Sequence, residues 1–241
     1  MIQKTRAIVL HSFKYGESGM IVRMLTPNFG MLSFLAHGAR KARSKNKASL
    51  FQPLSILDVV AYIKPGDQLQ HIREVRCPHP FTTIHSDIRK TSLALFMAEI
   101  LLNSIKHQDI QADAYNFVEK AVYHLDSEQV KLAEFHIVFL LQLSKYLGFY
   151  PGRNYSASHC YFNLREGSYQ AVFDGELNSL DQEESKLFFA LSDIPVGENP
   201  STSLSHPMRM RLLQKIIDYY RYHMEGFREI KSLRVLETVF N

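Results

Sequence analysis

The sequence predicts an α+β protein that begins with a five-stranded β-barrel and continues as an α-helical domain with a small two-stranded insertion. Three observations support this. Short apolar, β-branched runs separated by turn residues fill residues 1–80, apolar residues recur at helical spacing from residue 86, and a stretch at 153–177 again has strand character. The 241 residues suffice for one large domain or two small ones, and we predict domains at 1–80 and 81–241.

Five strands are expected in the first domain: Thr5–Phe13, Met20–Thr26, Met31–His37, Leu54–Ile63 and Gln68–Arg76. Turn residues such as Tyr15–Gly19, Pro27–Gly30 and Lys64–Asp67 separate them. Five short strands without a long helix suit a small closed barrel, for which the OB-fold is the natural candidate.

Helices are expected from residue 86, where Ser86 can act as N-cap, and then at Ala112–Leu125, Glu128–Leu147, Asp181–Leu191, Met208–Met224 and Ser232–Phe240. The helix at Glu128–Leu147 is apolar on nearly all faces and should lie at the centre of the helical domain. Within the insertion, Cys160–Leu164 and Ser168–Phe173 are predicted to form the two strands.

Charge is distributed unevenly along the chain. Residues 1–80 contain 12 Lys+Arg and 4 Asp+Glu, a net charge of +8, whereas the rest of the chain is net −4. A basic small domain indicates a polyanionic partner for that domain. The alternative is an effect on solubility, which would not concentrate the charge in one third of the chain.

The most informative segment is a basic loop between the third and fourth predicted strands. Five cations fall within eight positions: Arg40, Lys41, Arg43, Lys45 and Lys47. Only small or polar residues separate them, so the loop favours a phosphate backbone as its partner. If all five contact single-stranded DNA, a plot of the logarithm of the binding constant against the logarithm of the salt concentration should have a slope of about −3.5. The alternative is a solvated loop without a ligand.

OB-folds hold single strands with a basic groove and aromatic stacking residues. Most aromatic residues of the barrel are expected in its core. Tyr15 and Phe29 lie in predicted turns and are the better candidates for stacking on bases. No base-reading motif is present, which indicates binding without sequence preference.

The order of several motifs resembles the RecO family of bacterial DNA repair and recombination mediators. They are Thr5–Leu10, Tyr15–Ser18, Val22–Thr26, Gly30, Ala36–Lys41, Ser44-Lys45, Phe51–Leu54, Leu147–Pro151 and Lys231–Leu233. The resemblance spans the chain and is strongest over residues 5–58.

This resemblance implies an OB-fold, a helical domain and a zinc-ribbon-like insertion. It implies binding of single- and double-stranded DNA, annealing of complementary strands and partnership with RecR. It also implies help in loading RecA onto DNA coated by single-stranded DNA-binding protein, whose acidic tail docks on the helical domain.

Two departures from the family pattern concern zinc and the acidic tail. A structural zinc site needs four N or S ligands, and the insertion offers only His159 and Cys160, so we expect no metal or other cofactor. Cys77, His79 and His85 form a stray cluster elsewhere. Where the family's tail pocket has an arginine, this chain has an apolar residue near Ile137 or Val138, and Lys131 or Lys145 could replace it.

The sequence indicates a protein that is not an enzyme. It lacks a phosphate-binding Gly-Lys-Ser/Thr loop. Asp181, Glu183 and Glu184 resemble the carboxylates of a metal-dependent nuclease, but acids at a predicted helix start also favour the helix dipole. A nuclease and a generic RNA-binding protein therefore remain the alternatives. No signal peptide or membrane span is apparent, so a cytoplasmic, nucleoid-associated protein is expected.

Overall fold

The computed structural model describes residues 1–40, 48–64, 69–105 and 112–240. The chain forms two compact units. The first consists of Met1–Ser127 with Ile230–Leu236, and the second of Glu128–Glu229 with Glu237–Asn241. The predicted α+β class, with a barrel, helices and a small two-stranded sheet, is confirmed.

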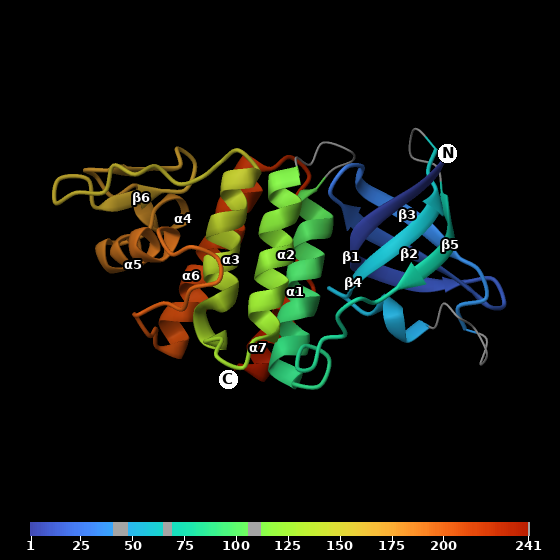
Figure 1. Cartoon of the computed structure of the whole chain (residues 1–241). Coiled ribbons are helices and arrows are strands. Elements are labelled where there is room, and N and C mark those ends of the chain that lie inside the picture. Colours follow the sequence, from blue (N-terminus) through green and yellow to red (C-terminus); the bar gives the residue numbers. More distant parts are fainter. Residues whose placement is uncertain (41–47, 65–68, 106–111, 241) are drawn as a thin grey trace. The chain divides into compact units, whose positions relative to one another are not determined.

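The first unit begins with a closed five-stranded barrel, drawn in blue to teal in Figure 1. Its strands are β1 (Ile2–Tyr15), β2 (Gly19–Thr26), β3 (Gly30–Ala36), β4 (Ile56–Tyr62) and β5 (Gln70–Arg76). They are ordered β1-β2-β3-β5-β4, and β1 pairs with β4 to close the barrel. Neighbouring strands are antiparallel except for the parallel pair of β3 and β5. All five predicted strands are present, and the barrel is consistent with the predicted OB-fold.

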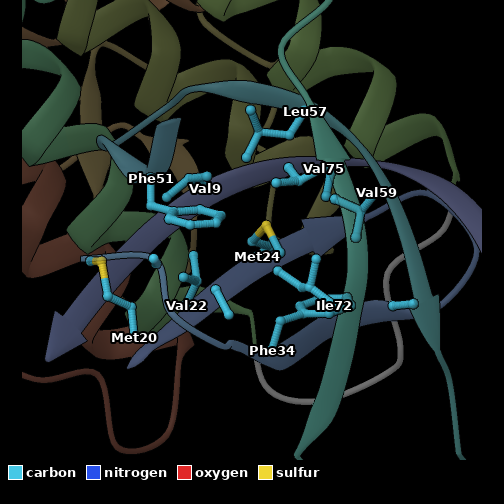
Figure 2. Packing of buried hydrophobic residues seen from close by; sticks show 14 of the residues in the cluster. Val9, Met20, Val22, Met24, Phe34, Phe51, Leu57, Val59, Ile72 and Val75 are labelled. Atoms are coloured by element: carbon cyan, nitrogen blue, oxygen red, sulfur yellow. The ribbon is translucent and has the colours of Figure 1, made fainter. Parts of the chain in front are cut away.

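The barrel core is built from inward-facing side chains of all five strands. Val9, Val22, Met24, Phe34 and Ile72 point toward one another in Figure 2. A short 3-10 helix, Ala48–Phe51, precedes β4 and was not predicted. It inserts Phe51, which is almost completely buried, into the same cluster. The chain thus has enough apolar side chains to fill this small barrel without a ligand.

Two helices complete most of the first unit, α1 (Ile88–Ser104) and α2 (Ala112–Asp126), and α1 packs against β1. The predicted cap of α1 is wrong by one residue. The N-cap is Asp87, whose side chain accepts from the Arg89 N–H at 2.8 Å. The Ser86 hydroxyl instead donates to the Thr82 carbonyl at 2.9 Å.

The second unit is organised around α3 (Leu132–Tyr146), which contacts α5 (Gln182–Ser192) and α6 (His206–His223). As predicted, α3 is buried along most of its length, although it begins four residues later than expected. The Tyr220 hydroxyl of α6 donates to the Leu140 carbonyl of α3 at 2.7 Å. The α6 N-cap is Ser205, with Pro207 in the first turn, so this helix begins two residues before the predicted start.

The insertion contains β6 (Tyr161–Asn163), β7 (Ser168–Gln170) and the four-residue helix α4 (Gly175–Asn178), which was not predicted. Both strands are shorter than expected. The last helix, α7 (Ser232–Val239), has residues in both units. Among the described residues, no helix is long and apolar enough to cross a membrane.

Candidate nucleic-acid interface

Arg40 is joined to the turn between β1 and β2. Its Nη2 donates to the Gly16 carbonyl at 2.7 Å and also to the Glu17 carbonyl, and its backbone N–H donates to the Ser18 carbonyl at 3.1 Å. Gly16 has a φ of +57°, a value that favours glycine. The start of the basic loop is therefore fixed to this turn, although the two are more than twenty residues apart in sequence.

The base of the basic loop is closed by a backbone hydrogen bond. The Ala48 N–H donates to the Ala39 carbonyl at 3.0 Å, and Ala39 is buried in the barrel core. Arg40 itself is exposed. The other predicted cations lie outside the described residues: Lys41, Arg43, Lys45 and Lys47. The structure therefore describes where this segment leaves the barrel and where the chain returns to it.

The two predicted stacking residues have different surroundings. Tyr15 is the last residue of β1, and 51% of its surface is exposed. Phe29 is half-buried in the turn between β2 and β3, where it packs against the barrel core. Tyr15 is thus the more accessible ring, and its place beside the Gly16 turn brings it near Arg40 in the fold.

Two exposed aromatic side chains were missed in the sequence. Phe13 is 44% exposed on β1, and Tyr62 is 46% exposed at the end of β4. Tyr62 lies opposite His71 of β5, whose Nδ1 is 3.1 Å from Nε2 of His37. The two imidazole rings are stacked with centroids 5.3 Å apart. Side chains alternate between the two faces of a strand, so these rings could have been assigned to the outer face. That assignment requires the pairing of the strands, which the sequence does not give.

The insertion does not fit a zinc site. Its two candidate ligands are His159, whose Nδ1 lies 3.1 Å from the Ser158 hydroxyl, and Cys160, which is half-buried. Nowhere in the described part of the chain do three or more His, Cys, Asp or Glu side chains form a group that could hold a metal. Cys77 packs against the barrel core, and burial raises the pKa of its thiol, which disfavours the thiolate that zinc requires.

Aromatic packing accounts for the insertion instead. Phe162 of β6 is fully buried, with ring centroids 4.4 Å from Phe188 of α5 and 4.9 Å from Tyr169 of β7. Tyr219 of α6 lies 5.5 Å from the same ring. The rings of Tyr161 and Phe173 lie nearer the surface, with centroids 5.5 Å apart. The two-stranded sheet is therefore attached to α5 and α6 by an apolar cluster.

Two of the three carboxylates considered for a nuclease have a structural role, whereas Glu183 is exposed. Asp181 caps α5 by accepting from the Glu184 N–H at 2.8 Å, and the Glu184 carboxylate accepts from the Asp181 N–H at 3.1 Å. This reciprocal pair is a capping box, which stabilises the helix start. Glu184 is also buried, 3.6 Å from Arg211. Capping of the helix therefore accounts for the positions of Asp181 and Glu184.

The positions considered for tail docking also differ in accessibility. Ile137 and Val138 are buried in the second unit. Lys131 and Lys145 are both exposed, but the Lys131 ammonium already donates to the Pro200 carbonyl at 3.1 Å. Of the two lysines, Lys145 is therefore the more available for an acidic ligand.

The closed five-stranded barrel, in the order β1-β2-β3-β5-β4, is consistent with the class of OB-fold proteins. Residues 1–81 match the family model "Recombination protein O N terminal", and residues 85–234 match "Recombination protein O C terminal". The chain belongs to the RecO family, whose members are non-enzymatic recombination mediators.

Full-length relatives agree with this assignment. The chain is 36% identical to "DNA repair protein RecO" of Flavobacterium psychrophilum over 239 residues, which cover 99% of each chain. It is 34% identical to the protein of that name from Flavobacterium johnsoniae over 99% of each chain. Identity to the Bacteroides fragilis protein is 32% over the full length of both chains.

Proposed function

We propose that this protein binds single- and double-stranded DNA without sequence preference through the basic loop and the turn between β1 and β2. The observation that carries the proposal is the attachment of Arg40 to the Gly16 and Glu17 carbonyls. In OB-folds the loop between the first two strands is a common nucleic-acid contact. The attachment of Arg40 to this turn therefore supports a binding surface that includes both the turn and the start of the basic loop.

Strand annealing follows from the same electrostatics. Two complementary strands repel each other through their phosphates, and cations that neutralise the phosphates of both strands lower that repulsion. Contacts to the backbone alone leave the base edges free to pair. The proposed activity is thus to bring strands together and, with RecR as partner, to help load RecA onto DNA coated by single-stranded DNA-binding protein.

An annealing assay tests this proposal. Two complementary labelled oligonucleotides are mixed with and without the protein, and annealing is followed by energy transfer, first with bare strands and then with strands coated by single-stranded DNA-binding protein. We expect acceleration in both cases, and loss of it in a variant with the five loop cations changed to alanine. An unchanged rate with the wild-type protein would contradict the proposal.

The same samples separate the alternatives. A nuclease would shorten the labelled strand when magnesium is present, and a generic RNA-binding protein would prefer RNA of the same sequence and fail to anneal DNA. We expect full-length strands and no preference for RNA.

For the acidic tail, we propose docking on the second unit with Lys145 as the charged contact. A peptide that corresponds to the tail should lose affinity for a Lys145→Ala variant. It should bind a Lys131→Ala variant nearly normally, because the Lys131 ammonium already donates to the Pro200 carbonyl. Equal binding to the wild type and to the Lys145 variant would place the tail elsewhere.

A further inference from the structure

Three aromatic side chains form a row on the outer face of the end of β1: His11, Phe13 and Tyr15. All three are exposed, and the His11 and Phe13 rings are 5.9 Å apart with their planes tilted by 34°. We propose that this row stacks on bases and makes the protein bind single-stranded DNA more tightly than duplex DNA. The inference rests on the proposed function and extends it to a preference for unpaired strands.

A β-bulge explains why these rings face solvent. Ala7 and Val9 point into the barrel, so regular alternation would also point residues 11, 13 and 15 inward. The pairing with β2 shifts instead, from Val9 opposite Met24 to His11 opposite Arg23, which leaves Leu10 as an extra residue. One extra residue reverses the face of everything after it. The bulge therefore turns two large aromatic rings out of a barrel that could have buried them.

The partner strand leaves one of the rings uncovered. Phe13 lies opposite Ile21 of β2, whereas Tyr15 lies opposite Gly19, which has no side chain. A Cβ atom added at Gly19 would lie 2.8 Å from the Tyr15 carbonyl oxygen, so the local backbone excludes any larger residue. A glycine at this place keeps the Tyr15 ring free of a cross-strand neighbour, as a stacking surface requires.

Cations flank the row at both ends. Arg23 of β2 lies opposite His11, and Arg40 is bonded to the turn that follows Tyr15. A nucleic-acid strand that crosses the row would thus have its phosphates near positive charge while its bases meet the rings. This charge is what distinguishes the row from an apolar surface for a protein partner.

The row discriminates between single and paired strands for a physical reason. Side chains at alternate residues recur about 6.6 Å apart along a strand, so successive rings can each take one base. An unpaired base can leave its neighbours and stack on a protein ring, whereas a base in a duplex is already stacked on both faces. The basic loop serves both forms of DNA, and the aromatic row adds affinity only for the single strand.

A single tryptophan at position 13 tests the inference directly. The chain contains no tryptophan, so Phe13→Trp places a lone indole in the row. We expect single-stranded DNA to quench its fluorescence strongly and duplex DNA to change it little. Ile88→Trp is the matched control, because Ile88 is 67% exposed at the start of α1, away from the row in sequence and element. Its fluorescence should respond to neither ligand.

Phe13→Ala gives the energetic test. Loss of one base–aromatic stack should weaken single-strand binding by about 5- to 150-fold, with duplex binding unchanged and Phe13→Trp close to wild type. Circular dichroism and thermal unfolding of each variant show whether the barrel is intact. If DNA binds but the indole is not quenched, or if both forms of DNA lose affinity equally, the aromatic row is not a stacking surface. Failure of the wild-type protein to bind DNA at all would contradict the proposed function itself.

Discussion

The guanidinium of Arg40 donates a hydrogen bond of 2.7 Å to the carbonyl oxygen of Gly16. This bond connects the start of the basic loop with the turn between β1 and β2. The bond gives the first of the five cations a fixed place on the barrel. This arrangement is the structural basis of the DNA binding that we propose for the first unit.

Arg40 should contribute to DNA binding through both charge and geometry. Arg40→Ala should lower affinity and reduce the salt slope by about 0.7 on single strands. Arg40→Lys should restore part of the salt dependence, because it keeps the positive charge. It should restore less of the affinity, because an ammonium lacks the planar guanidinium that donates to two carbonyls. Fluorescence anisotropy at several salt concentrations measures both quantities. Arg73→Ala, which removes an exposed arginine of β5, is the control and should leave binding nearly unchanged.

Asp126 should stabilise the first unit. Its carboxylate accepts from the N–H groups of Thr83 at 2.9 Å, Ile84 at 3.0 Å and Thr82 at 3.2 Å, in the segment before α1. We expect Asp126→Ala to lower the free energy of unfolding by about 2–4 kcal/mol, because these donors lose a charged partner. Denaturant unfolding measures this. Asp113→Ala, at an exposed position in the same helix, should cost less than about 1 kcal/mol.

The Asp126 contribution should also depend on pH. Burial alone would raise the pKa of this carboxyl, but the N–H donors hold it below its usual value. A lowered pKa means that the contribution is complete above about pH 4 and is lost as pH falls through the folded-state value. The difference in stability between the wild type and Asp126→Ala should therefore shrink in acid. A constant difference down to pH 2 would contradict this assignment.

His136 should make the second unit sensitive to mild acid. Burial, with a smaller effect of nearby Arg209, lowers the pKa of its imidazole to about 3. Because the unfolded chain takes up this proton near pH 6.5 and the folded protein does not, the stability present above pH 6.5 falls as pH decreases toward 3. The slope from this residue approaches about 1.4 kcal/mol per pH unit. Denaturant unfolding of the wild type and of His136→Leu at several pH values measures this. The free energy of unfolding should fall more steeply with decreasing pH in the wild type than in the variant.

The insertion should be stable without metal. Because its aromatic side chains pack against α5 and α6 and the described residues hold no group of metal ligands, a chelator should leave thermal unfolding unchanged. Phe162→Ala should instead destabilise the second unit by about 3–5 kcal/mol, since it removes a fully buried ring. A fall in melting temperature on addition of chelator would show that a metal contributes.

Much of the fold could be predicted because local patterns determine it. A turn at Gly16 and a turn just before Gly30 separate the first three strands, and α3 is so apolar that it must be buried. The errors arise where a single hydrogen bond or a single residue determines where a helix begins or whether it forms. Asp87 rather than Ser86 caps α1, and the four-residue α4 is too short to show a helical period.

The candidate interface was predicted in part. Clustering of charge indicated the basic loop, but the bond from Arg40 to Gly16 depends on tertiary structure. The outward position of Phe13 depends on a bulge at Leu10, within a run of apolar residues in which no change of register is visible. Exposure of a ring therefore needs the pairing of two strands, which a single sequence does not supply.

The most direct test of the account is the salt dependence of single-strand binding in three proteins. They are the wild type, a loop variant with Arg40, Lys41, Arg43, Lys45 and Lys47 changed to alanine, and a control that loses five exposed cations elsewhere, Lys120, Lys145, Arg153, Lys186 and Lys231. We predict that the loop contributes about −3.5 to the slope of log binding constant against log salt concentration. This contribution should be lost in the loop variant and kept in the control. Equal slopes in the wild type and the loop variant would show that DNA does not bind at this loop.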